Sequence, residues 1–145
     1  MPDATSNVTS TTQCSYHYSD QAVSREIYRA QWRRTIRGLL SVKYSNMQQR
    51  CKGDHQKRYE GLDLLPRYEF MEWGLNDPTF NMLFEAWHEA GCPYRLTPSI
   101  DRIDTTGGYT LGNIRFLTHS DNARRGAMRR WHGAESVSLD GVATR

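Results

Sequence analysis

The stretch TPSIDRIDTTGGYTLGNIRFLTHSDNARRG, residues 97–126, decides the fold of this chain. Residues 96–104 predict a short strand, and the residues TTGG (105–108) predict the turn that ends it. Residues 113–118 predict a second strand, which the turn would place beside the first. Ser120 then predicts the N-cap of a helix over residues 121–131. The expected unit is therefore a strand, a turn, a second strand and a helix.

This small unit would bring two oxygen-bearing side chains together. Asp101 lies near the end of the first expected strand, and Asn122 lies in the first turn of the expected helix. Mg²⁺ binds few protein oxygens and fills its remaining positions with water or phosphate oxygens. Asp101 and Asn122 are therefore the candidate metal ligands, and Mg²⁺ is the expected cofactor.

The motif resembles that of the HNH nucleases, also called ββα-metal or His-Me finger nucleases. This family is common in bacteriophage genomes and includes homing-type enzymes. The matching residues are SIDRID (99–104), GY (108–109), NIR (113–115) and Asn122. Looser matches are YSNMQQRC (44–51), YEG (59–61) and the expected helix end at residues 87–91, so the likeness covers roughly residues 36–125.

The resemblance implies a role for each matching residue. It makes Asp101 the acidic metal ligand and Asn122 the residue that completes the metal site. It makes Asn113 the side chain that pins the hairpin loop and helps to orient the general base, while Asp104 and Gly108 shape the turn. The implied activity is metal-dependent hydrolysis of phosphodiester bonds in duplex DNA.

The chain departs from the family motif at Arg102, which stands where the family has its catalytic histidine. Arginine stays protonated at ordinary pH and is a poor base. Arg102 could instead bind the scissile phosphate and stabilise its growing charge, or it could be a structural salt-bridge partner of Asp104. The base would then be metal-bound hydroxide, His119 or Tyr59. His119 could equally be a solvent-facing residue at the end of a strand.

The expected helix is rich in arginine after Asn122. The four cations that follow closely are Arg124, Arg125, Arg129 and Arg130. Cations near a helix C-terminus neutralise its dipole, but four exceed that need, so we expect them to contact DNA phosphates. The helical segment over residues 29–37 could supply a second backbone contact. No segment indicates an element that reads base edges.

The rest of the chain predicts an α+β protein with a helical N-terminal part at residues 24–91, followed by the ββα-metal core at 95–131. Ser24 is the expected first N-cap, Gly38 a weak point, and residues 42–50 a second helical stretch. Residues 1–20 and 132–145 lack periodicity and are expected to be flexible tails, which leaves one nuclease domain over residues 21–131. The residues expected in the helical core are Tyr68, Met71, Trp73, Phe80, Leu83, Phe84 and Trp87.

Charge is divided into blocks along the chain. Residues 24–59 hold ten Lys or Arg against two acidic residues, residues 60–91 hold seven acidic residues against one Arg, and residues 95–131 hold seven Arg against three Asp. The two basic blocks indicate a polyanion-binding face, or alternatively a solvated basic surface without a partner.

Cysteine usage and hydropathy exclude several classes of protein. The three cysteines, Cys14, Cys51 and Cys92, form no Cys-x-x-Cys pair, which disfavours a zinc ribbon or a disulfide framework. No apolar run reaches the roughly 20 residues of a membrane span, and the N-terminus has no secretion signal pattern. A cytoplasmic protein is expected, in a bacterial host cell if the chain is phage-encoded.

Three functions remain open at this point. A DNA endonuclease is favoured because a protein that only binds DNA needs no metal ligands. A non-catalytic DNA-binding module on a degenerate HNH fold is the alternative, since Arg102 replaces the usual base. An RNA-binding or RNA-processing protein is the third. The sequence indicates neither a recognition site nor an oligomeric state.

Overall fold

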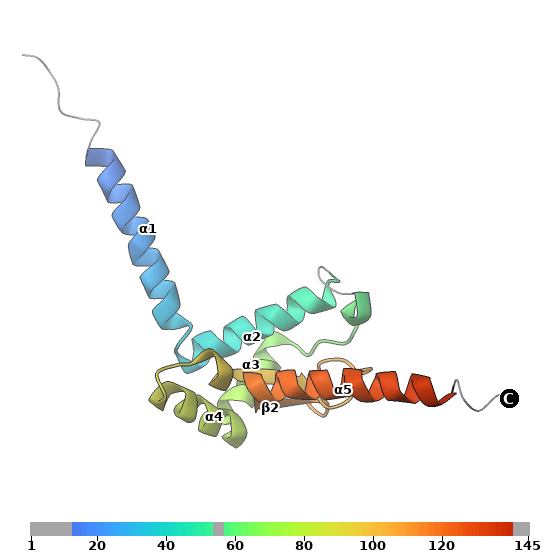
Figure 1. Cartoon of the computed structure of the whole chain (residues 1–145). Helices are drawn as coiled ribbons and strands as arrows, with labels where there is room; N and C mark the ends of the chain where they lie inside the picture. Colours follow the sequence, from blue (N-terminus) through green and yellow to red (C-terminus); the bar gives the residue numbers. More distant parts are fainter. Residues whose placement is uncertain (1–12, 54–56, 141–145) are drawn as a thin grey trace, which may run out of the picture.

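The chain begins with helices and ends with a hairpin and a long helix. The computed structural model describes residues 13–53 and 57–140. Its elements are α1 (Gln13–Trp32), α2 (Ile36–Cys51), the short 3-10 helix η1 (Lys57–Tyr59), α3 (Arg67–Asn76), α4 (Pro78–Glu89), the 3-10 helix η2 (Tyr94–Leu96), β1 (Pro98–Arg102), β2 (Ile114–Thr118) and α5 (His119–Asp140) (Figure 1). This arrangement confirms the predicted α+β class and the strand–strand–helix order.

β1 and β2 form an antiparallel pair in which Asp101 lies opposite Arg115. The first strand is shorter than predicted, because η2 occupies residues 94–96 and β1 ends at Arg102. Past Ile103 the ladder stops, since the Asn113 side chain takes the place of a backbone partner and accepts the Asp104 N–H at 2.8 Å.

The core lies where α3 and α4 cover one face of the hairpin. Phe116 of β2 stacks on Trp73 with 4.6 Å between ring centroids, and it meets Phe80 at 4.8 Å. Its cross-strand partner Ile100 is also buried. Because side chains alternate between the faces of a strand, the neighbouring residues of β1 face the other way, toward α5.

The predicted helical core is confirmed with one exception. Phe80 and Trp87 are buried, and the other predicted residues of α3 and α4 pack against them half-buried: Met71, Trp73, Leu83 and Phe84. The prediction is wrong for Tyr68, which is 69% exposed. Its hydroxyl donates to Glu69 at 3.0 Å on the solvent side of α3.

The first helix differs from the prediction at both ends. α1 begins at Gln13, so Ser24 lies inside a helix and does not cap one, and residues 13–20 are helical where a disordered tail was expected. The rest of that predicted tail, residues 1–12, falls outside the described residues. Residues 21–32 are exposed, and α1 stands away from the other helices (Figure 1).

Gly38 proves to be a contact point between helices. The chain breaks after Trp32, and Thr35 caps α2 by accepting the Gly38 N–H at 3.1 Å. A Cβ on Gly38 would lie 1.8 Å from the carbonyl oxygen of Trp32. Glycine is therefore needed here for the close approach of the α1 end to the first turn of α2.

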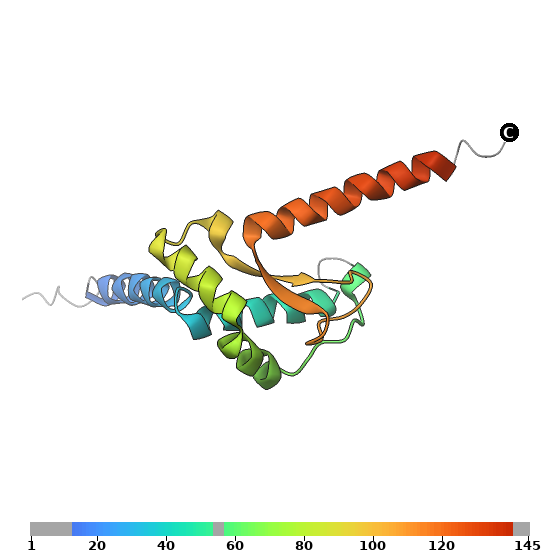
Figure 2. The same cartoon turned by 90° about the horizontal axis from the view of Figure 1, so that it is seen from below.

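The last helix is longer than predicted in both directions. Thr118, not Ser120, supplies the cap: its hydroxyl accepts the Asp121 N–H at 3.1 Å and donates to the Asp121 carboxylate at 2.8 Å. α5 runs on to Asp140, past the predicted end at Trp131, and its second half extends beyond the body of the molecule (Figure 2). Within the described residues, none of the helices combines the length and the apolar character needed to cross a bilayer.

Candidate nucleic-acid interface

Asn113 fixes the shape of the hairpin loop through three hydrogen bonds. Its amide nitrogen donates to the carbonyls of Asp104 at 3.0 Å and Gly108 at 2.8 Å, and its oxygen accepts the Asp104 N–H at 2.8 Å. This is the geometry of a residue that pins the loop. Asn113 does not reach the cavity described below, so its contribution to any chemistry would be positional.

The loop is also attached to the segment before α3. Tyr109 donates its N–H to the Asp63 carbonyl at 2.7 Å and accepts from the Leu65 N–H at 2.9 Å. A Cβ on Gly108 would lie 2.5 Å from the Asp63 carbonyl oxygen. The glycine therefore allows two backbone segments to touch, which is the turn-shaping task expected of it.

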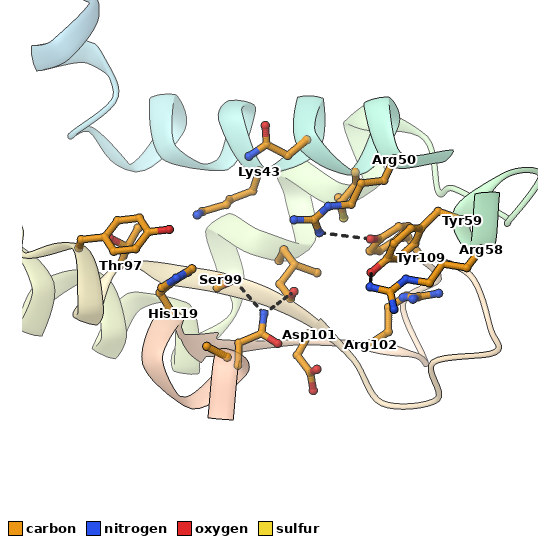
Figure 3. A pocket seen from close by; sticks show the side chains of 16 residues that line it. Lys43, Arg50, Arg58, Tyr59, Thr97, Ser99, Asp101, Arg102, Tyr109 and His119 are labelled. Carbon is orange, nitrogen blue, oxygen red and sulfur yellow. Dashed lines mark hydrogen bonds between the residues drawn. The ribbon is translucent and has the colours of Figure 1, made fainter. Parts of the chain in front are cut away.

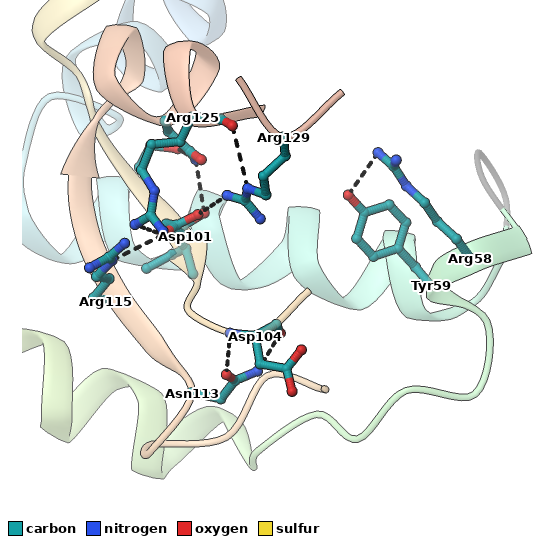
Figure 4. Close-up of polar contacts among 11 residues, drawn as sticks. Arg58, Tyr59, Asp101, Asp104, Asn113, Arg115, Arg125 and Arg129 are labelled. Atoms are coloured by element: carbon teal, nitrogen blue, oxygen red, sulfur yellow. Dashed lines mark hydrogen bonds and ion pairs between the residues drawn. The ribbon is translucent and has the colours of Figure 1, made fainter. Parts of the chain in front are cut away.

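Asp101 is surrounded by three arginines (Figure 4). Its side chain is 3% exposed, and its carboxylate bonds Arg115 Nε at 3.0 Å, Arg125 Nη1 at 2.8 Å and Arg129 Nη2 at 3.0 Å. Two of these partners follow at a spacing of four residues on α5, and the third lies directly opposite on β2. The three guanidiniums carry two more positive charges than the single carboxylate balances.

These contacts do not fit a magnesium site. Both carboxylate oxygens of Asp101 already accept guanidinium hydrogen bonds, so a cation would have to displace arginines from a buried acid. Asn122 donates to the Ser99 hydroxyl at 2.9 Å and the Ile100 carbonyl at 3.1 Å, which ties α5 to β1. Among the described residues, no group of three or more His, Cys, Asp or Glu gathers where it could hold a metal ion. In this structure Asp101 and Asn122 therefore join α5 to the hairpin, and their role as Mg²⁺ ligands remains a prediction.

Arg102 points to the other side of β1, toward α2 and η1 (Figure 3). It is 8% exposed and donates to the Gly107 carbonyl at 2.8 Å. Its guanidinium carbon lies 4.6 Å from the ring centroid of Tyr59 and 5.3 Å from that of Tyr109. Aromatic faces attract a guanidinium but leave its full charge in place.

Arg102 and Asp104 do not form the salt bridge considered above. Asp104 is exposed, and its carboxylate accepts from the Thr106 hydroxyl at 2.7 Å and the Thr106 N–H at 2.9 Å. These two bonds, the hydroxyl first, lower the pKa of Asp104, with the charge of Arg102 as a smaller cause. Asp104 therefore belongs to the turn.

A cavity of about 550 Å³ lies between α2 and the face of β1 that carries Arg102. Figure 3 shows its residues. Among the described residues that line it, four are cations, namely Lys43, Arg50, Arg58 and Arg102, and one, Asp101, is acidic. The Asp101 carboxylate is turned toward the arginines of α5, so the cavity is cationic.

Lys43 lies half-buried in this wall. Burial lowers the pKa of Lys43, and the neighbouring charge of Arg50 lowers it further. Both causes destabilise the protonated amine of Lys43. Nothing offsets them, since no described residue accepts a hydrogen bond from this amine or pairs with it. An anion bound in the cavity would stabilise the protonated amine and so raise the pKa of Lys43 again.

The two alternative bases both lie on the cavity. His119 lines it at the end opposite Arg102, with its ring centroid 4.2 Å from that of Tyr94. Tyr59 lies under Arg102 and accepts from Arg58 at 3.2 Å. His119 is therefore half-buried at a cavity wall and does not simply face solvent.

The four arginines of α5 divide into two pairs. Arg125 and Arg129 bind Asp101, whereas Arg124 makes a surface contact with Asp121 at 3.4 Å and Arg130 is exposed.

Sequence reasoning missed Arg115, Lys43 and Arg50. The first could have been found from the hairpin register, which pairs it with Asp101, and the other two from their seven-residue spacing on one face of α2.

Comparison with known proteins assigns no relationship, since no family model, no curated protein and no solved structure matches this chain.

Proposed function

We propose that this chain binds duplex DNA through the phosphate backbone, without needing a metal ion. The contact surface is the arginine ridge, defined as Arg115, Arg124, Arg125, Arg129 and Arg130. The observation that carries the proposal is the cluster around Asp101, where three guanidiniums share one carboxylate. Such a surplus of fixed positive charge is what a polyanion recognises.

The arginines of the cluster keep donors free for a second partner. A guanidinium has five N–H donors, and Asp101 takes one from each of the three. The side chains of Arg115, Arg125 and Arg129 remain 40%, 36% and 36% exposed. Asp101 thus fixes their orientation while their outer edges can meet phosphate oxygens.

A binding module fits this geometry better than a nuclease. The acid that should hold the metal is occupied by arginines, and the position of the usual base holds an arginine whose charge is buried. The alternative stated from the sequence, a DNA-binding module on a degenerate HNH fold, is therefore the function we favour.

Fluorescence anisotropy tests this proposal with a labelled duplex of about 25 base pairs, which is roughly two and a half helical turns. We expect binding in EDTA, and we expect Arg124→Gln and Arg130→Gln each to reduce the slope of log K against log salt by about 0.9. Lys52→Gln is the control, because Lys52 is an exposed cation at the end of α2 and outside the ridge. No binding in EDTA, or equal slopes for all variants, would refute the ridge. An RNA competitor that displaces the DNA at lower concentration would instead support the RNA-binding reading.

A metal-dependent endonuclease is the second candidate, because two contacts of the hairpin agree with the HNH resemblance. Asn113 pins the loop as the HNH resemblance implies, and Asn122 lies beside β1 at the start of α5. Incubating supercoiled plasmid with the protein in Mg²⁺ or in EDTA separates the candidates. Nicked or linear product in Mg²⁺ alone would establish the nuclease, and unchanged plasmid under both conditions would leave the binding module.

A further inference from the structure

The two faces of β1 carry different sites. Asp101 faces α5 and organises the arginine ridge, whereas the next residue, Arg102, faces α2 and lines the cavity. A duplex lying on the ridge would present its phosphates to the exposed arginines of β2 and α5. The cavity, whose wall also includes Asp101 of β1 and Asn122 of α5, lies beside the ridge and needs an explanation of its own.

The charge of Arg102 has no acidic partner in the described part of the chain. Its contacts are one carbonyl and two aromatic rings, and it takes no part in the ion pairs formed by Asp101 and Asp121. A buried cation without a counter-charge is costly. Lys43, which is half-buried on the facing wall, adds a second cation without an acidic partner among the described residues. Together they make the cavity a site for an anion.

The size and the walls of the cavity narrow the kind of anion. A volume of about 550 Å³ is much larger than a phosphate needs and falls in the range of small-molecule sites. His119 and the ring of Tyr94 stand at one end, and Arg102 stands at the other (Figure 3). Arg102 itself lies on the rings of Tyr59 and Tyr109, and Arg50 donates to the Tyr109 hydroxyl at 3.4 Å, so cations and aromatic rings are both present along the cavity. Cations together with aromatic rings suit a ligand with a phosphate and a flat base.

We propose that this cavity binds a single nucleotide unit that lies outside any duplex stack, with its phosphate held by Lys43 and Arg50 and its base against Tyr94 and His119. The proposal rests on the proposed function only in taking nucleic acid as the source of the ligand. Two sources share this chemistry, namely a free mononucleotide and an unpaired nucleotide at the end of a strand.

Isothermal titration of the full chain with dAMP, adenosine and inorganic phosphate tests the chemistry. We expect dAMP to bind at least about tenfold more tightly than either part, since losing a charge-assisted contact or a stacking contact costs about that factor. Equal affinity for dAMP and phosphate would show that the cavity does not recognise the base, which refutes the nucleotide proposal. If dAMP does not bind at all, the cavity is not an anion site of this kind. If a 5′-phosphorylated single strand binds more tightly than dAMP, the ligand is an unpaired nucleotide at the end of a strand. If dAMP binds more tightly than the strand, the ligand is a free mononucleotide.

Lys43→Met locates the site. Removing a desolvated cation should leave the melting temperature equal or higher, while the affinity for dAMP falls about tenfold. Lys52→Gln is the matched loss of charge and should change neither value. Unchanged dAMP affinity in Lys43→Met would overturn the assignment. Duplex binding measured on the same samples keeps the two proposals apart: a protein that binds duplex but not dAMP refutes only the cavity, and one that binds dAMP but not duplex refutes only the ridge.

Discussion

Asp101→Asn is the substitution that separates a structural acid from a metal ligand. Asparagine keeps the shape of the side chain but removes the charge that three guanidiniums share. The carboxylate is 3% exposed, with contacts of 2.8, 3.0 and 3.0 Å. Breaking a fully buried ion pair costs about 3–5 kcal/mol. Because each arginine is more than a third exposed and can turn toward water, we reduce this to about 2–3 kcal/mol.

That loss corresponds to a melting temperature about 6–12 °C lower for a chain of this size. Differential scanning calorimetry in EDTA measures it directly. Asp121→Asn is the matched control, because its ion pair with Arg124 is exposed and 3.4 Å long. We expect it to cost less than about 1 kcal/mol.

The same melts with added Mg²⁺ complete the test. Because Asp101 is already occupied, Mg²⁺ should leave the melting temperature of the wild-type chain unchanged. A wild-type protein stabilised by Mg²⁺, with that stabilisation lost in Asp101→Asn, would show that Asp101 is a metal ligand after all. An Asp101→Asn protein as stable as wild type in EDTA would refute the structural role.

Three further predictions concern the hairpin. Asn113→Ala removes three hydrogen bonds and should cost about 2–4 kcal/mol in urea unfolding, whereas equal stability would mean that the loop is held from elsewhere. Gly108→Ala places a Cβ 2.5 Å from the Asp63 carbonyl oxygen and should destabilise by about 1–3 kcal/mol; a neutral result would show that the two segments separate easily. The pKa of Asp104 is lowered by the hydroxyl and the N–H of Thr106, so its stabilising contribution is present above about pH 4 and is lost as the pH falls through the lower folded-state pKa. Thr106→Val should therefore flatten the acid limb of a stability–pH curve, and an unchanged limb would exclude this cause.

The hairpin and the last helix could be predicted from the sequence because their signals are local. The glycines of the turn, the alternation around Ile100 and Phe116 and the arginine-rich segment after Asn122 each specify one element. The core residues of α4 followed from helical spacing for the same reason. Tyr68 shows the limit of this reasoning, since spacing alone does not say which side of a short helix meets solvent.

The environment of Asp101 could not be predicted from the motif alone. The motif gives the residue and its strand, but the partners of Asp101 and its exposure to solvent depend on residues that converge from β2 and two turns of α5. Arg115 was predictable in principle from the strand register. The cavity was not, because α2 contributes Lys43 and Arg50 from a segment some sixty residues before the strand. The first helix was predicted from Ser24 onward, but its start at Gln13 was missed because residues 1–20 carry no apolar periodicity.

The most direct test of the central claim is a duplex-binding titration carried out twice, in EDTA and in Mg²⁺, with the DNA recovered afterwards on a denaturing gel. We expect the same affinity within about twofold under both conditions, a salt slope of about −3 to −4 from three to four arginine–phosphate contacts, and intact DNA in both lanes. Binding that requires Mg²⁺, or cut strands that appear only with Mg²⁺, would contradict the claim and restore the metal-dependent nuclease.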